Sequence, residues 1–99
     1  MTVYIKDFRF VKSFGKEYIK FRYFTGYKWK PLKVINTFKP DNSAVFTRYV
    51  LQCATDDICN NETDVLKRNE ILKNYLLTIQ CIEQVNSSEF TGATKLYNT

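Results

Sequence analysis

The chain has 99 residues, of which 44% are hydrophobic and 25% are charged, and this length supports one small folded domain with a single core. Its 15 Lys and Arg against ten Asp and Glu give a net charge of +5, and with only three Gly and two Pro the composition excludes a disordered or collagen-like chain. No stretch approaches the ~20 apolar residues of a membrane helix, and charges at Lys6, Asp7 and Arg9 interrupt any signal-peptide pattern, so we expect no membrane partner.

The positive charge is concentrated in the N-terminal part of the chain. Residues 1–50 carry a net charge of +8, and residues 51–99 carry a net charge of −3. Between Val3 and Lys33, nine basic residues are interleaved with ten aromatic ones. Cations neutralise phosphates and aromatic rings stack on bases, so this stretch indicates a single-stranded nucleic acid as the partner. The alternative is a solvated antiparallel sheet with a basic outer face, because strands are generally rich in aromatic residues.

Residues 3–14 and 18–24 are predicted to form a β-hairpin around Gly15. A two-residue loop, Phe14-Gly15 or Gly15-Lys16, sets even residues of the first strand beside odd residues of the second. One face is predicted to lie in the core and holds Tyr4, Phe8, Phe10, Ile19, Phe21 and Tyr23. The other face is predicted to meet solvent or ligand and holds Asp7, Arg9, Val11, Tyr18, Lys20, Arg22 and Phe24.

A third strand is predicted over residues 27–38, where Pro31 indicates an edge position or a bulge. A two-residue turn before it places Trp29 on the face of Arg22. A three-residue turn places Trp29 in the core and brings the neighbouring lysines beside Arg22. The sequence leaves this choice open.

Residues 39–43 are predicted to form a turn, and residues 44–54, AVFTRYVLQCA, have an ambiguous pattern. Their β-branched and aromatic residues favour a fourth strand, which we predict here. A helix capped by Ser43 is the alternative, because apolar residues also recur at helical spacing.

A long helix is predicted over residues 62–85, with a cap at Asn61 or Thr63. Its apolar stripe consists of Val65, Leu66, Leu72, Tyr75, Leu76, Ile79 and Ile82. The predicted fold is therefore α+β, an antiparallel sheet of three to five strands with one long C-terminal helix packed on it. We expect a single small domain over residues 1–88, and a tail over residues 89–99 that forms a short strand or stays flexible.

No catalytic constellation is present, so we expect no enzymatic activity and no cofactor. The chain has no His, which removes the commonest general base and metal ligand. Cys53, Cys59 and Cys81 form neither an even disulfide framework nor a zinc-binding pattern, so we expect free thiols, no metal and a reducing cytoplasmic location.

The candidate binding set combines cations that would meet phosphates with rings that would stack on bases. Its members are Arg9, Tyr18, Lys20, Arg22, Phe24, Tyr27, Lys28, Trp29 and Lys30. For each aromatic residue the alternative role is core packing, and for each lysine it is solubility.

Residues 15–22, GKEYIKFR, resemble the second strand of the transcriptional positive-coactivator family of single-stranded DNA-binding proteins, which is related to the Whirly proteins. Lys30-Pro31 is similar to a Lys-Pro pair before a later strand of that family, so the resemblance covers residues 15–31. The chain departs from the family in lacking a Gly-rich KPGKKG run after Pro31 and in its additional segment at 44–61. The resemblance implies a curved four-stranded sheet that binds a nucleic-acid strand, dimerisation through helices, and basic contacts from Lys16, Lys20, Arg22 and Lys30.

We therefore expect a small basic protein of viral or phage type that binds single-stranded DNA or RNA. The alternative is a protein-interaction module that docks a host protein through the sheet face or an unpaired strand edge. In both cases the apolar stripe of the 62–85 helix makes a homodimer reasonable.

Overall fold

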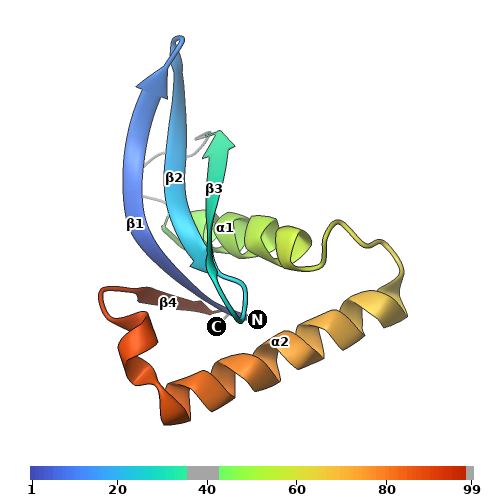
Figure 1. Cartoon of the computed structure of the whole chain (residues 1–99). Coiled ribbons are helices and arrows are strands. Elements are labelled where there is room, and N and C mark those ends of the chain that lie inside the picture. Colours follow the sequence, from blue (N-terminus) through green and yellow to red (C-terminus); the bar gives the residue numbers. More distant parts are fainter. Residues whose placement is uncertain (36–42, 98–99) are drawn as a thin grey trace.

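The computed structural model describes residues 1–35 and 43–97. The elements follow in the order β1 (Thr2–Ser13), β2 (Lys16–Phe24), β3 (Trp29–Ile35), α1 (Ser43–Ile58), α2 (Val65–Val85), a 3₁₀ turn η1 (Ser87–Phe90) and β4 (Thr94–Tyr97). The strands form one antiparallel sheet in the order β3-β2-β1-β4, which places β3 at an edge as Pro31 predicts. The predicted α+β class and antiparallel sheet are confirmed (Figure 1).

The hairpin of β1 and β2 turns at Phe14-Gly15, one of the two predicted loops. Both residues have positive φ values, 52° and 74°, as a type I′ turn requires, and Ser13 pairs with Lys16 across it. The tip of this hairpin projects away from both helices (Figure 1).

A β-bulge interrupts β1 at Asp7. Lys6 pairs with Arg22 and Arg9 with Lys20, so Asp7 and Phe8 together stand opposite the single residue Phe21. Asp7 takes the left-handed conformation, with φ of 57°. Because of the extra residue, odd residues of β1 face the core before the bulge and even residues face that side after it.

The bulge corrects part of the predicted core face. Val3 and Ile5 are buried, whereas Tyr4, predicted in that core, lies on the opposite face and stacks on Phe90 with ring centroids 3.8 Å apart. Phe8 and Phe10 keep the predicted side but are 40% and 61% exposed. The reason is that β4 pairs only with residues 2–5, so β1 becomes the sheet edge beyond Ile5.

The main core lies between the sheet and α1. Val50, Leu51 and Ala54 of α1 pack on a cluster of strand residues, namely Val3, Ile5, Ile19, Phe21, Tyr23 and Val34. The prediction of a strand over 44–54 is therefore wrong, because the residues that meet the sheet recur at spacings of one and four, as on one face of a helix. The described residues form two α-helices, α1 and α2, rather than one long C-terminal helix.

The second helix, α2, crosses the other face of the sheet at one end. Asp64 caps it, and not Asn61 or Thr63 as predicted, by accepting hydrogen bonds from the backbone N–H groups of Leu66 and Lys67, at 2.9 and 3.2 Å. Of the predicted apolar stripe only Tyr75 and Ile79 are buried, in a second cluster with Phe24 and Phe90. The remaining face of the sheet, toward the hairpin tip, is left open by α2 (Figure 1).

Near the C-terminus the short strand β4 pairs with residues 2–5 of β1. The predicted end of the third strand at 36–38 and most of the turn predicted at 39–43 lie outside the described residues. Within the described part of the chain, no helix is both long and apolar enough to cross a membrane.

Candidate nucleic-acid interface

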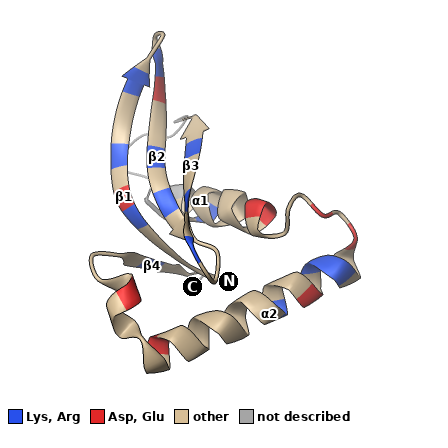
Figure 2. Cartoon of the chain, viewed as in Figure 1, with Lys and Arg blue, Asp and Glu red and all other residues tan. Residues whose placement is uncertain are grey.

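Five cations line the open face of the sheet. We call them the basic strip: Lys6, Arg9, Lys20, Arg22 and Lys33. They come from three neighbouring strands, and several of them border a surface hollow over these strands. Figure 2 shows this concentration of basic residues on β1, β2 and β3.

The strand register explains why these cations share one face. Arg9 pairs with Lys20, which pairs with Lys33, so these three form one row across β1, β2 and β3. Lys6 and Arg22 pair in the next row, two residues further along β2. Neighbouring strands lie ~4.8 Å apart, so the basic strip is compact and its like charges repel one another.

One acid lies within the basic strip. Asp7 Oδ2 accepts a hydrogen bond from Arg22 Nη1 at 3.1 Å, and both side chains remain about half exposed. The four strands contain only one other acid, Glu17, which pairs with Lys12 near the hairpin tip.

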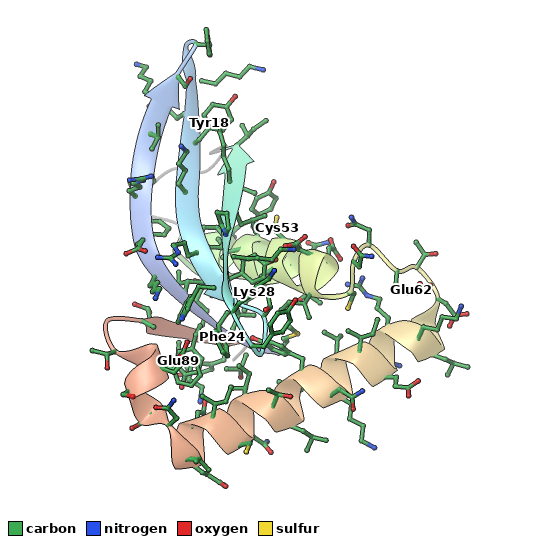
Figure 3. The ribbon with its side chains drawn as sticks, in the orientation of Figure 1. Tyr18, Phe24, Lys28, Cys53, Glu62 and Glu89 are labelled. Atoms are coloured by element: carbon green, nitrogen blue, oxygen red, sulfur yellow. The ribbon has the colours of Figure 1, made fainter. Side chains whose placement is uncertain are left out.

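Tyr18 contributes an aromatic ring beside the basic strip. It is half-buried, and Lys33 Nζ lies 3.9 Å from its ring centroid, a cation–π distance. Its position toward the hairpin tip separates it from Phe24, which lies at the other end of the sheet near Glu89 (Figure 3). Tyr18 therefore combines an aromatic surface with adjacent cations, as a single-strand binding surface requires.

Trp29 lies on the same face of the sheet as Arg22, which is the first of the two alternatives that the sequence left open. The turn before it has four residues, and not the two or three considered from the sequence. Its Nε1–H donates to Glu89 Oε1 at 3.1 Å, and its ring packs against Phe24 and Phe90. Lys6 Nζ lies 4.1 Å from the ring centroid. The indole is thus held in the second cluster, with a lysine over one face.

The structure separates four other residues of the predicted binding set from the basic strip. Phe24 is 1% exposed in the second cluster, so its ring offers no surface for stacking. Tyr27 is 77% exposed in the turn before β3, where Lys28 Nζ lies 5.4 Å from its ring centroid. Lys30 points to the opposite face and lies 3.9 Å from Asp57. Arg9, Tyr18, Lys20 and Arg22 are brought together as expected.

Sequence reasoning missed Lys6 and Lys33 as members of the basic strip. Lys6 shares a face with Arg9 only because the bulge at Asp7 inserts one residue between them. Lys33 joins through the β2–β3 register, which a four-residue turn sets. For Lys6 the missing signal is a backbone irregularity, and for Lys33 it is the length of a turn.

A network of three side chains closes the α2 end of the open face. Tyr4 Oη donates to Glu83 Oε1 at 2.8 Å, and Lys95 Nζ lies 3.1 Å from the same oxygen. The hydrogen bond from Tyr4, followed by Lys95, lowers the pKa of Glu83. Burial, followed by that hydrogen bond, raises the pKa of Tyr4 to about 12. Glu83 is therefore ionised at neutral pH and ties α2 to β1 and β4.

The cysteines and acids form no chemical site within the described residues. Burial raises the pKa of the Cys53 and Cys59 thiols, which favours the unreactive protonated form. Asp56, which precedes Asp57 in the sequence, forms an ion pair with Arg68 Nη2 at 2.7 Å. No group of three potential metal ligands occurs among residues 1–35 and 43–97.

The chain matches no protein-family model, no curated protein and no solved structure.

Proposed function

We propose that this protein binds single-stranded nucleic acid through the basic strip and Tyr18. The observation that carries the proposal is the row of Arg9, Lys20 and Lys33, which crosses three strands of an open sheet face. Three cations within two strand spacings form an electrostatic surface suited to a polyanion, and phosphate neutralisation supplies most of the affinity of such complexes.

A single strand fits this surface better than a duplex. Tyr18 can stack on a base only when the face of that base is accessible, and in a duplex neighbouring base pairs cover it. The open face is also bounded by α2 and η1 at one end, where Tyr4 and Phe24 pack on Phe90. A flexible strand can follow the short free surface between this boundary and the hairpin tip. The partial resemblance of residues 15–31 to a single-stranded DNA-binding family is consistent with the same partner.

The direct test is fluorescence anisotropy with a labelled single-stranded oligonucleotide at low and high salt. We expect binding that weakens as salt rises, and weaker competition from the matching duplex than from unlabelled single strand. Lack of binding at low salt, or an affinity indifferent to salt, contradicts the proposal. Single-stranded DNA and RNA competitors of the same sequence then distinguish the two nucleic acids.

The second candidate is a protein-interaction module, and the edge of β1 favours it. β4 pairs with residues 2–5, and beyond Ile5 β1 lies at an edge of the sheet that the described strands form. Such an edge can accept a strand from another protein, for example a host protein bound by a viral one. Recovery of one stoichiometric protein on the immobilised chain after nuclease treatment supports this candidate over the first.

We also propose that α2 supports a homodimer. Leu66, Leu77 and Val85 of α2 are 80%, 55% and 80% exposed. Apolar side chains at these exposures on one helix are a common feature of helix pairs between subunits. Sedimentation equilibrium measures the mass directly, and a monomer at concentrations well above those of the binding assay contradicts the dimer.

A further inference from the structure

Asp7 occupies an unusual place in the basic strip. It sits at the bulge of β1 in the left-handed conformation, φ 57°, and its carboxylate reaches Arg22 Nη1 at 3.1 Å. Arg22 otherwise belongs to a face of cations, with Lys6 as its cross-strand partner and Lys20 two residues away on β2. The carboxylate is thus an anion already bound where the proposed ligand would place a phosphate.

The fold does not require an acid at this position. Asn adopts the left-handed backbone conformation of this bulge position as readily as Asp, and Gly adopts it more readily, because the position constrains only the backbone. The ion pair is about half exposed on both sides, and pairs of this kind contribute little to stability. A carboxylate at residue 7 therefore has its main effect on the electrostatics of the basic strip.

The chemistry of the two anions is closely similar. A carboxylate and a phosphate both accept charge-assisted hydrogen bonds from a guanidinium, so only one of them can occupy the same Arg22 donor at a time. Asp7 also places a negative charge beside the path of the negatively charged nucleic acid, which further lowers the affinity of the basic strip for it.

We propose that Asp7 is an internal phosphate mimic that competes with nucleic acid for Arg22 and so limits the affinity of the basic strip. This inference rests on the proposed function and deepens it by assigning its regulation. In the free protein Arg22 is paired with Asp7, and on binding Arg22 exchanges the carboxylate for a phosphate. Arg9 and Lys20, for which no ion pair is found among the described residues, provide the initial contacts.

The test compares Asp7→Asn with the native protein in the anisotropy assay at low salt. Asn keeps the size of the side chain and tolerates the left-handed backbone, so thermal unfolding of the variant should match that of the native protein. Loss of an exposed competing pair predicts binding tighter by about two- to five-fold. Glu17→Gln is the matched control, because it removes the same charge from the same hairpin near its tip, and it should change the affinity less.

A double-mutant cycle assigns the effect to Arg22. In an Arg22→Gln background the gain from Asp7→Asn should largely disappear, because no guanidinium is left to compete for. The inference is overturned if the Asp7→Asn variant binds the oligonucleotide no more tightly than the Glu17→Gln variant. It is also overturned if Asp7→Asn raises the affinity as much in the Arg22→Gln background as in the native protein. If the native protein binds no oligonucleotide at low salt, the proposed function fails and this inference with it. If the native protein binds and Asp7→Asn gives no gain, the inference fails alone.

Discussion

Removing the row of three cations is the sharpest perturbation of the proposed interface. The variant Arg9→Gln, Lys20→Gln, Lys33→Gln keeps long polar side chains on all three strands and lowers the net charge from +5 to +2. Arg9 and Lys33 are exposed and Lys20 is half-buried, and all three repel one another across the strands. We therefore expect the fold to be retained, with a stability change within about 1 kcal/mol.

The expected change is in the salt dependence of binding. Each phosphate neutralised on a single strand contributes about 0.7 to the slope of log affinity against log salt. Five contacts from the basic strip give a slope of about −3.5, so that affinity falls about 100-fold between about 50 and 200 mM salt. The two cations left in the variant, Lys6 and Arg22, give a slope of about −1.4 and a fall of about seven-fold over the same range.

The assay is anisotropy of a labelled single-stranded oligonucleotide across this salt range. The matched control replaces Lys12, Lys67 and Lys73 by Gln, which gives the same net charge but leaves the basic strip intact. A control with the same reduced slope as the variant would refute the reasoning, because net charge alone would then explain binding. An unchanged slope in the variant would place the interface elsewhere.

Three further predictions concern single side chains. Tyr18→Leu should weaken oligonucleotide binding by about 1 kcal/mol or more while Tyr18→Phe retains it, and equal losses in the two variants would exclude stacking. Tyr75→Phe should raise the free energy of unfolding in urea by up to about 1 kcal/mol, because the buried Tyr75 hydroxyl has no hydrogen-bond partner within the described residues; a clear loss would show that the hydroxyl is satisfied. The lowered pKa of Glu83 contributes stability that is present above the pKa of a Glu in the unfolded chain and is lost as pH falls through the lower folded-state pKa. Glu83→Gln should therefore flatten the acid side of the stability profile below the ordinary pKa of a Glu carboxyl. A native and a Gln profile of equal steepness would contradict this assignment.

The hairpin could be predicted from sequence because its information is local. Gly15 and its alternating neighbours specify a two-residue turn, and the turn fixes the register of the hairpin next to it. The same reasoning failed at Tyr4, because the bulge at Asp7 reverses the alternation. A bulge formed by Asp leaves little trace in the sequence, where a Gly would have marked it.

The helix α1 illustrates a different limit. Val45, Thr47 and Tyr49 favour a strand locally, yet the segment is helical because Val50, Leu51 and Ala54 cover the sheet as one face. Tertiary packing overrides local preference here, and the sequence does not show which surface needs to be covered. The longer α2 was predictable from its periodicity, whereas the burial of only Tyr75 and Ile79 was not.

The candidate site was predicted in part for the same reasons. Arg9, Lys20 and Arg22 follow from hairpin parity, while Lys33 needed the register of β3 and Lys6 needed the bulge. Phe24 was assigned to the right face, but its coverage by α2 and η1 depends on contacts between distant parts of the chain.

The bulge at residue 7 allows β1 to lose one residue without a change of its two faces. Val3 and Ile5 before it and Phe8 and Phe10 after it face the same side of the sheet, so β1 accommodates one additional residue without exchanging its two faces. If residue 7 were deleted, all the remaining side chains of β1 would therefore stay on their present side of the sheet. It would lose only the local bend of the strand and the acid within the basic strip. Deletion of one residue normally moves the following side chains of a strand to the opposite face. At residue 7 we expect such a deletion to be tolerated.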